Sequence, residues 1–419
     1  MPKRPLEDNY YMDITETIDT LPVVENKTHL YKQPEKLLRI YLNIFSIVFI
    51  EFLIMGISLG VLPAFVHETL GFSNLWVGVV IGVQYVATLC ARQFSGNLAD
   101  KAGGKRAVQY GLLLSCLSGL LLLLAGLLAT HGVWCLAGLL VARIVLGIGE
   151  SLLVIGIFAW GFKLVGSANT GKVMVWNGMG MYGGMACGAP LGMALLGYTN
   201  LALVFTLTII LPIVAYLIMR LLPAVALPKK AAQIPFYKAI NLIWRSGAGL
   251  ALASIGFGGI ASFISLYFIQ HNWEGGSLAL TSFGASYIIV RLFLAGAPDQ
   301  YGGAKVAFIS LLVELAGQLL VWGGFSSYLT IFGAALTGAG LSLVFPSFGQ
   351  IAIKKVAPEN RGIAMAAYNA FFDIGLAITA PVAGLLAGDG QYQHVYLFGS
   401  VAVFISALFA LKELRSQPN

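Results

Sequence analysis

Five charged residues interrupt long apolar stretches of this sequence. Glu51, Arg143, Glu150, Glu314 and Asp373 each lie inside a run of mostly hydrophobic residues. A charged side chain at the centre of a membrane-spanning helix costs about 2.5 to 3.5 kcal/mol on insertion scales, so this many charges indicate a use. A buried carboxyl group can bind and release protons near neutral pH, and a buried arginine can hold an anionic group. We therefore expect proton coupling or substrate binding at several of these positions.

Two of the charges lie close together in the sequence. Arg143 and Glu150 are seven residues apart. On a helix this spacing is two turns, so both side chains share one face at a separation of roughly 10 Å. They could line one water-filled cavity, or they could form a purely structural ion pair. Among the carboxyl groups, Glu51, Glu150 and Asp373 are the candidates for proton coupling or substrate binding.

The composition identifies the surroundings of these charges. Of the 419 residues, 58% are hydrophobic and 10% are charged, and the mean hydropathy is +0.84. Water would not accommodate so much apolar surface, so we expect an integral membrane protein. A spanning helix needs roughly 20 apolar residues, which predicts twelve spans. The expected spans are 40–64, 75–96, 107–129, 134–160, 172–196, 200–222, 247–270, 277–296, 305–325, 329–352, 363–387 and 393–412.

Lysine and arginine predict the orientation of these spans. Every second loop lacks both residue types, and the loops on the opposite side hold nearly all of the 25 basic residues. The positive-inside rule therefore places both termini in the cytoplasm. The formal net charge of +7 follows from this asymmetry. We expect the lipid bilayer as a partner and no nucleic acid.

A repeated segment divides the chain into two halves. Residues 96–106 read GNLADKAGGKR, and a degenerate copy lies 199 positions later around Asp299. A second pair of similar segments, 168–174 and 359–365, has an offset of 191. Such repetition predicts two related bundles. The expected segments are a disordered cytoplasmic tail at 1–35, bundles at 36–222 and 247–413, a cytoplasmic linker at 223–246 and a cytoplasmic tail at 414–419.

The repeated segment resembles a family signature. It is similar to the loop between the second and third helices of the major facilitator superfamily, which combines glycines, an aspartate and basic residues. Arg143, followed by Gly147 and Gly149, resembles the basic motif of the fourth helix. The segment LGVLP at 59–63 resembles a pattern of the twelve-helix exporters. The signature positions are Gly96, Asp100, Lys101, Gly103, Lys105 and Arg106, with Gly104 as an insertion.

The resemblance implies a fold and a placement of the charges. The fold would be an all-α membrane protein with twelve transmembrane helices in two pseudo-symmetric six-helix bundles. Spans one, four, seven and ten of this family line a central cavity, so Glu51, Arg143 and Glu150 should face it. Asp373 could reach the cavity from the other half. The ninth span is peripheral in the family, so we expect a local buried hydrogen bond for Glu314.

Two glycine-containing motifs predict gating and close packing. Asp100 could accept hydrogen bonds from helix amides or basic side chains and hold one face shut, with Asp299 as its copy, although the whole segment could also be a solvated topogenic cluster. Span five has glycines at intervals of four residues, which form a smooth stripe for helix packing. This stripe resembles an antiporter motif, but close packing alone explains it nearly as well. Its members are Gly180, Gly184, Gly188, Pro190 and Gly192.

These features predict a secondary transporter. We expect a monomer in the bacterial inner membrane that exports small organic compounds against protons by alternating access. An importer or uniporter of sugars or organic acids is the alternative among transporters, and a membrane sensor or intramembrane enzyme is the alternative from another class. The four cysteines show no paired or metal-type spacing, so we expect neither a metal nor another cofactor.

Overall fold

The computed structural model describes residues 34–166, 169–225, 235–356 and 361–415. Within these residues twelve helices are long and apolar enough to cross a membrane, which confirms the expected number. The expected tail at 1–35 lies almost entirely outside the described residues. Backbone amides and carbonyls have no water to bond to in the bilayer core, so helices that satisfy them internally are the stable solution.

The elements follow one another without strands in the described ranges. They are α1 (Pro34–Ala64), η2 (Phe65–Thr69), α2 (Asn74–Ala102), α3 (Gly104–Leu127), α4 (Gly132–Val165), α5 (Thr170–Tyr198), α6 (Leu201–Arg220), α7 (Phe236–Gln270), α8 (Gly276–Leu294), α9 (Ala297–Tyr301), α10 (Gly303–Gly323), α11 (Ser327–Lys354), α12 (Arg361–Ala387) and α13 (Gln393–Arg415).

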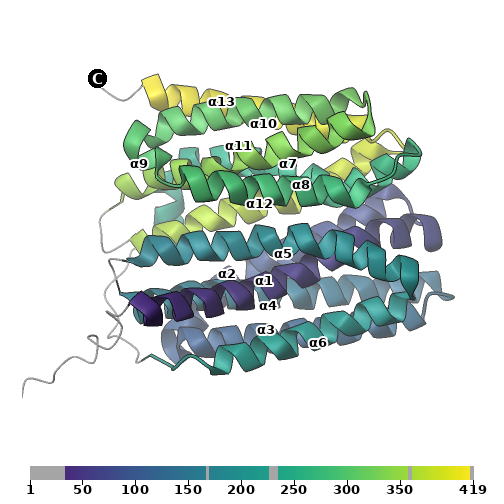
Figure 1. Ribbon diagram of the computed structural model, residues 1–419, viewed down its shortest axis with the longest axis horizontal. Coiled ribbons are helices and arrows are strands. Elements are labelled where there is room, and N and C mark those ends of the chain that lie inside the picture. The colour runs from purple at the N-terminus through teal and green to yellow at the C-terminus, as the bar shows by residue number, and fades with distance from the viewer. Residues whose placement is uncertain (1–33, 167–168, 226–234, 357–360, 416–419) are drawn as a thin grey trace, which may run out of the picture.

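The helices form two bundles that lie side by side. The N half contains α1–α6 and the C half contains α7–α13, and Figure 1 shows them as a lower and an upper layer. Each half has six of the twelve spanning helices, because α9 in the C half and η2 in the N half are only five residues long, and the expected fold of two six-helix bundles is thus confirmed. Helices α1 and α7 are the most buried spans, whereas α6 and α8 are among the least buried. The centre of the molecule is therefore built around α1 and α7.

Several helices extend beyond the expected spans. Helix α7 begins at Phe236, so the second part of the expected linker is helical. The signature segment is also mostly helical, since α2 continues to Ala102 and the chain turns only at Gly103, with φ of 97°. A left-handed φ suits glycine because it has no Cβ, and helix α3 starts at the next residue. The expected loop is therefore a single-residue turn between two helices.

The glycine stripe of α5 packs against α1. A Cβ atom added to Gly184 would lie 2.7 Å from the backbone nitrogen of Leu53, and one added to Gly188 would lie 2.8 Å from the Cα atom of Gly56. Gly180 and Gly192 face α1 in the same way. Both helices belong to the N half. The stripe thus allows close packing of α1 and α5 inside one bundle.

The two ends of the bundles differ in charge. We call the end with the α2–α3 turn the basic end, because it carries Lys101, Lys105, Arg106 and Lys163. We call the opposite end, where α2 begins and α12 ends, the Asn74 end.

Candidate functional site

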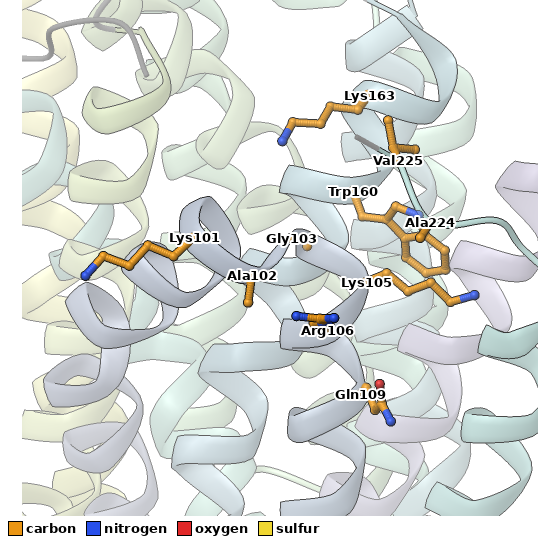
Figure 2. A pocket seen from close by; sticks show the side chains of 11 residues that line it. Lys101, Ala102, Gly103, Lys105, Arg106, Gln109, Trp160, Lys163, Ala224 and Val225 are labelled. Carbon is orange, nitrogen blue, oxygen red and sulfur yellow. The ribbon is translucent and has the colours of Figure 1, made fainter. Parts of the chain in front are cut away.

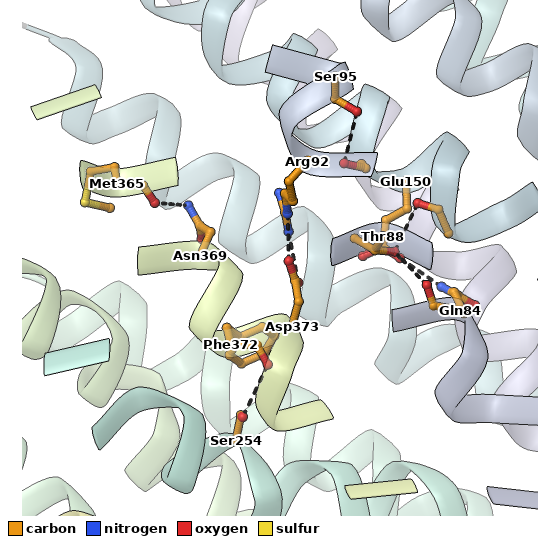
Figure 3. Close-up of polar contacts among 12 residues, drawn as sticks. Gln84, Thr88, Arg92, Ser95, Glu150, Ser254, Met365, Asn369, Phe372 and Asp373 are labelled. Carbon is orange, nitrogen blue, oxygen red and sulfur yellow. Dashed lines mark hydrogen bonds and ion pairs between the residues drawn. The ribbon is translucent and has the colours of Figure 1, made fainter. Parts of the chain in front are cut away.

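A stripe of polar residues on α2 organises the candidate site. Gln84, Thr88 and Arg92 are spaced by four residues, so they lie on one face of the helix. This face packs against α4 of the same half and against α12 of the other half. Figure 3 shows the stripe with its partners Glu150 and Asp373. The stripe therefore connects a carboxyl group of each half.

Glu150 of α4 is held by α2. Its Oε2 atom accepts a hydrogen bond from the Gln84 amide at 2.8 Å and lies 3.2 Å from the Thr88 hydroxyl. Glycine at position 147 lets α4 approach α2, because a Cβ atom there would overlap the backbone of Gln84. Glu150 is buried. The carboxyl group is therefore fixed in position by neutral donors.

Asp373 of α12 forms an ion pair with Arg92 across the two halves. The Nε atom of Arg92 donates to Oδ2 of Asp373 at 2.6 Å, and its Nη2 atom donates to Oδ1 at 2.9 Å. The two side chains are only 9% and 4% exposed. In Figure 3 they point directly toward one another, beside Thr88. A two-point arginine–carboxylate pair combines strong attraction with a defined geometry, so this contact specifies how the halves fit together.

Arg143 is buried without a partner. Its side chain is 0% exposed, and within the described residues none of its three guanidinium nitrogens has a hydrogen bond. Tyr85 and Glu150 lie within electrostatic range, but Arg143 makes no salt bridge with Glu150. The structural ion pair considered from the sequence is therefore not formed. A buried, unpaired charge is costly, so this position favours contact with an anion or with water.

Glu51 and Glu314 lie inside the individual halves. Glu51 accepts a hydrogen bond at 2.6 Å from Ser115 on α3, so its carboxyl group faces α3 in the described conformation. The expectation that Glu314 makes a local hydrogen bond is wrong, since neither of its oxygens has a partner in the described part of the chain. The nearby amide of Gln318 is already bonded to the Gly256 carbonyl and the Thr337 hydroxyl.

Asp100 and Asp299 have different surroundings. Asp100 is exposed in the last turn of α2, and none of the described residues forms a hydrogen bond or salt bridge with it. Asp299 in α9 accepts a hydrogen bond from Gln350 of α11 at 2.6 Å. Lys105, by contrast, donates to the carbonyl of Leu222, which directly follows α6. The signature segment is thus anchored through its lysine, while its aspartate is free in this conformation.

The Asn74 end is closed by contacts between the halves. The Asn74 amide donates to the Gly388 carbonyl at 2.8 Å, and the Tyr392 hydroxyl donates to Asn74 at 3.1 Å. Nearby, the Thr281 hydroxyl of α8 donates to the Ala186 carbonyl of α5 at 2.9 Å. The sequence did not predict a role for Asn74. Its only notable feature there is its position directly before an expected span.

The interface between α8 and α5 corresponds to that between α2 and α12 by the internal repeat, but it contains aromatic residues. By the internal offsets of 199 and 191, Arg291 corresponds to Arg92, and Tyr182 corresponds to Asp373. Arg291 donates to the Tyr287 hydroxyl at 2.6 Å, and the rings of Tyr287 and Tyr182 stack at 3.7 Å. The α8–α5 interface is therefore aromatic where the α2–α12 interface is ionic.

Comparisons with known proteins agree with this architecture. The pattern of the Major Facilitator Superfamily matches residues 44–295 and 252–419. An uncharacterized MFS-type transporter of Salmonella typhimurium strain LT2 is 41% identical over 87% of this chain and 94% of its own length. The uncharacterized MFS-type transporter YhhS of Escherichia coli K12 is 40% identical over 91% of this chain and 95% of its own.

Solved structures show the same fold at low sequence identity. The human organic anion transporter MFSD10 has a TM-score of 0.69 at 16% identity, with 90% of this chain and 100% of that chain covered. The E. coli fucose:proton symporter FucP has a TM-score of 0.63 at 17% identity, with 90% and 98% covered. The match over nearly the whole length, to the family and to these relatives, establishes that the chain belongs to the major facilitator superfamily of multi-pass membrane transporters.

Proposed function

We propose that the protein is a proton-coupled exporter of small organic compounds in the bacterial inner membrane, with its basic end in the cytoplasm. The observation that carries this proposal is the buried ion pair of Arg92 and Asp373, which joins the two halves. A proton that binds Asp373 removes the charge on which this contact depends. Proton binding is thereby linked to the relative position of the halves, which is the requirement for coupled alternating access.

The conformation supports access from the basic end. Hydrogen bonds that join the halves lie at the Asn74 end or at the level of Arg92. Within the described residues no hydrogen bond joins the halves between the level of Arg92 and the basic end. The described hydrogen bonds between the halves thus extend from the level of Arg92 to the Asn74 end. Under the positive-inside rule this conformation faces the cytoplasm.

The ion pair gives a reason for proton release in this conformation. A neighbouring arginine favours the charged form of a carboxyl group relative to the same buried group without it. Asp373 would therefore lose its proton when Arg92 approaches and would bind a proton when the halves separate around it. Proton uptake from the outside and release to the cytoplasm follow from this order. Glu150 lies within electrostatic range of both groups, so it shares in the same titration.

Arg143 provides a binding function for the same region. Its guanidinium group lies two turns from Glu150 on the face of α4 that packs against α2. Because this cation lacks a partner among the described residues, a substrate with a carboxylate or another anionic group would remove the cost of the buried charge. We include organic anions in the substrate class on this ground. The tyrosines at the α5–α8 interface would give apolar contact on the opposite side.

The proposal is tested by separating coupling from substrate movement. A screen of a deletion strain for altered accumulation or sensitivity supplies the substrate, and inverted vesicles then report uptake driven by a proton gradient. We expect Asp373→Asn to abolish gradient-driven uptake while exchange without a gradient persists, because an amide keeps the shape but cannot titrate. Glu150→Gln and Glu51→Gln are measured alongside it. Glu68→Gln, at a half-exposed carboxylate outside the network, is the control and should resemble the wild type.

Three outcomes bear on the alternatives. Wild-type gradient-driven uptake in all three network variants would contradict proton coupling through these groups and favour a uniporter or another coupling ion. Uptake that requires the opposite gradient direction would make the protein an importer. Loss of gradient-driven uptake together with exchange, in protein with normal expression, would assign the carboxyl group to substrate binding.

A further inference from the structure

A basic cavity lies at the cytoplasmic end of the N half, outside the network described above. It measures about 520 Å³ and is bordered by the α2–α3 turn, the end of α4 and the segment that follows α6. Four basic residues line it, and no acidic residue is among its lining residues. In Figure 2, Lys105 and Arg106 come from the start of α3, and Lys163 comes from the end of α4, while Lys101 extends away. The cavity has the size of a small-ligand site.

Trp160 and Lys105 build one wall of this cavity. The indole of Trp160 is buried and donates to the Pro223 carbonyl at 2.9 Å, which fixes the segment after α6. Lys105 lies 5.5 Å from the centre of the Trp160 ring and donates to the Leu222 carbonyl. Arg106 and Lys163, in contrast, form no hydrogen bond or salt bridge with any described residue. Arg106 and Lys163 are therefore available to a ligand beside this wall.

The corresponding place in the C half has a different polar contact. Gly303 corresponds to Gly104 at the start of a helix, and its backbone N–H donates to the Gln350 side chain at 3.0 Å. In α4 the residue that corresponds to Gln350 is Ala159, by the offset of 191. A methyl group cannot accept this hydrogen bond. The C half also has Gln300 and Ala304 where the N half has Lys101 and Lys105. The N half thus lacks the side-chain acceptor that Gln350 provides in the C half, and it has additional positive charge instead.

These observations point to a phosphate group as the ligand. Lysine and arginine side chains around a helix N-terminus provide the charge and the donors that phosphate oxygens accept. The surroundings favour a phospholipid as its source. Tyr110 and Leu113 of α3, Leu217 of α6 and Leu221 directly after α6 are exposed apolar side chains near the cavity. Acyl chains can lie along them while the phosphate occupies the basic cavity, as in other basic pockets at the cytoplasmic membrane face.

We propose that the cavity bordered by Lys105, Arg106 and Lys163 binds the phosphate of an anionic phospholipid headgroup at the cytoplasmic leaflet. Bound there, the headgroup neutralises the positive charge around the α2–α3 turn and holds this turn to the ends of α4 and α6. The site is a lipid-dependent support for the signature segment. It is independent of the proton network, which is at the interface of the halves.

The test uses full-length protein in nanodiscs of phosphatidylcholine with increasing fractions of phosphatidylglycerol, and the rise in unfolding temperature with this fraction gives the apparent affinity for phosphatidylglycerol. The variant Arg106→Gln with Lys163→Gln removes two free cations without breaking a described contact. Each basic residue near an anionic surface contributes about fivefold in affinity, so we expect a loss of roughly 25-fold. The matched control is Lys305→Gln with Lys354→Gln, the corresponding pair in the C half, which should change binding by less than about twofold.

The controls separate binding from folding and lipid from free phosphate. Both double variants should unfold like the wild type in phosphatidylcholine alone; should the first be unstable, Lys163→Gln alone gives the same comparison. Ala159→Gln introduces the glutamine that the C half has at Gln350, and it should also weaken phosphatidylglycerol binding. Equal losses in both double variants, or no loss in the first, would overturn the proposal. Stabilisation by inorganic phosphate in phosphatidylcholine, with no effect of phosphatidylglycerol, would overturn the assignment to lipid.

Discussion

Arg92→Leu is expected to destabilise the folded protein by about 3–5 kcal/mol, because it leaves the buried carboxylate of Asp373 without its counter-charge. Asp373→Leu should have a comparable effect for the corresponding reason. The double variant Arg92→Leu with Asp373→Leu should recover most of the loss, since well-packed apolar residues often replace a buried ion pair without cost. Unfolding of the purified protein, analysed as a double-mutant cycle, measures the coupling energy.

The internal repeat supplies the control for this cycle. Arg291→Leu removes the corresponding arginine of the C half, whose partner is the neutral hydroxyl of Tyr287. No buried carboxylate loses its partner there, so we expect a smaller loss than for Arg92→Leu. Additive effects of the two single substitutions at Arg92 and Asp373 would show that the pair contributes nothing to the contact between the halves. Transport in the double variant should be uncoupled from the proton gradient even where stability is restored.

Asp100→Asn is expected to reduce transport to near the background of vesicles that lack the protein, while expression and unfolding temperature stay close to those of the wild type. In the described conformation Asp100 is exposed and makes no described contact, so its charge is not needed for this state. We propose that it acts when the basic end closes, by accepting hydrogen bonds from the other half. Reconstituted vesicles give the transport rate for variants with equal amounts of inserted protein.

Asp299→Asn is the matched comparison for the second copy of the segment. An asparagine oxygen can still accept the hydrogen bond from Gln350, and the basic residue that follows Asp100 is replaced by Gln300 after Asp299. We therefore expect a milder loss of transport. Full activity of Asp100→Asn in reconstituted form would remove the gating role and leave the segment as a solvated topogenic cluster.

The fold could be predicted well from the sequence because the helices are determined by the composition of continuous segments. Apolar runs long enough to span the bilayer give the twelve helices directly, and the repeated segments around Asp100 and Asp299 give the two bundles. The helix ends were less predictable, since polar residues such as Asn97, Asp100 and Lys101 can continue a helix beyond the hydrocarbon core. Helix α2 ends at Gly103, where φ is 97°.

The candidate site could be predicted only in part. Burial of Glu51, Glu150 and Asp373 followed from charge within apolar runs, but their partners did not. Arg92 and Asp373 are separated by 281 positions, and a contact of this range depends on how two bundles pack. The signal that was present is the spacing of Gln84, Thr88 and Arg92, which marks a polar face within a hydrophobic span. The absence of a salt bridge between Arg143 and Glu150 among the described contacts likewise depends on side-chain orientations, which their spacing in the sequence does not determine.

The most direct test of proton-controlled alternating access is a distance measurement across both ends of the α5–α8 interface. In a background without the native cysteines, one spin-label pair replaces Tyr198 and Leu278 at the Asn74 end, and a second replaces Lys172 and Phe293 at the basic end. These four side chains are exposed, so labels disturb little packing. The distances are recorded in nanodiscs at acidic and alkaline pH.

Because the described conformation contains the ion pair of Arg92 and Asp373, alkaline pH should favour a short distance at the Asn74 end and a long one at the basic end. Acidic pH should shift the populations in the opposite direction. Asp373→Asn should resemble the wild type at acidic pH under both conditions, since its side chain cannot carry the charge. Distances in the wild type that do not depend on pH, or an unchanged pH response in Asp373→Asn, would contradict the account.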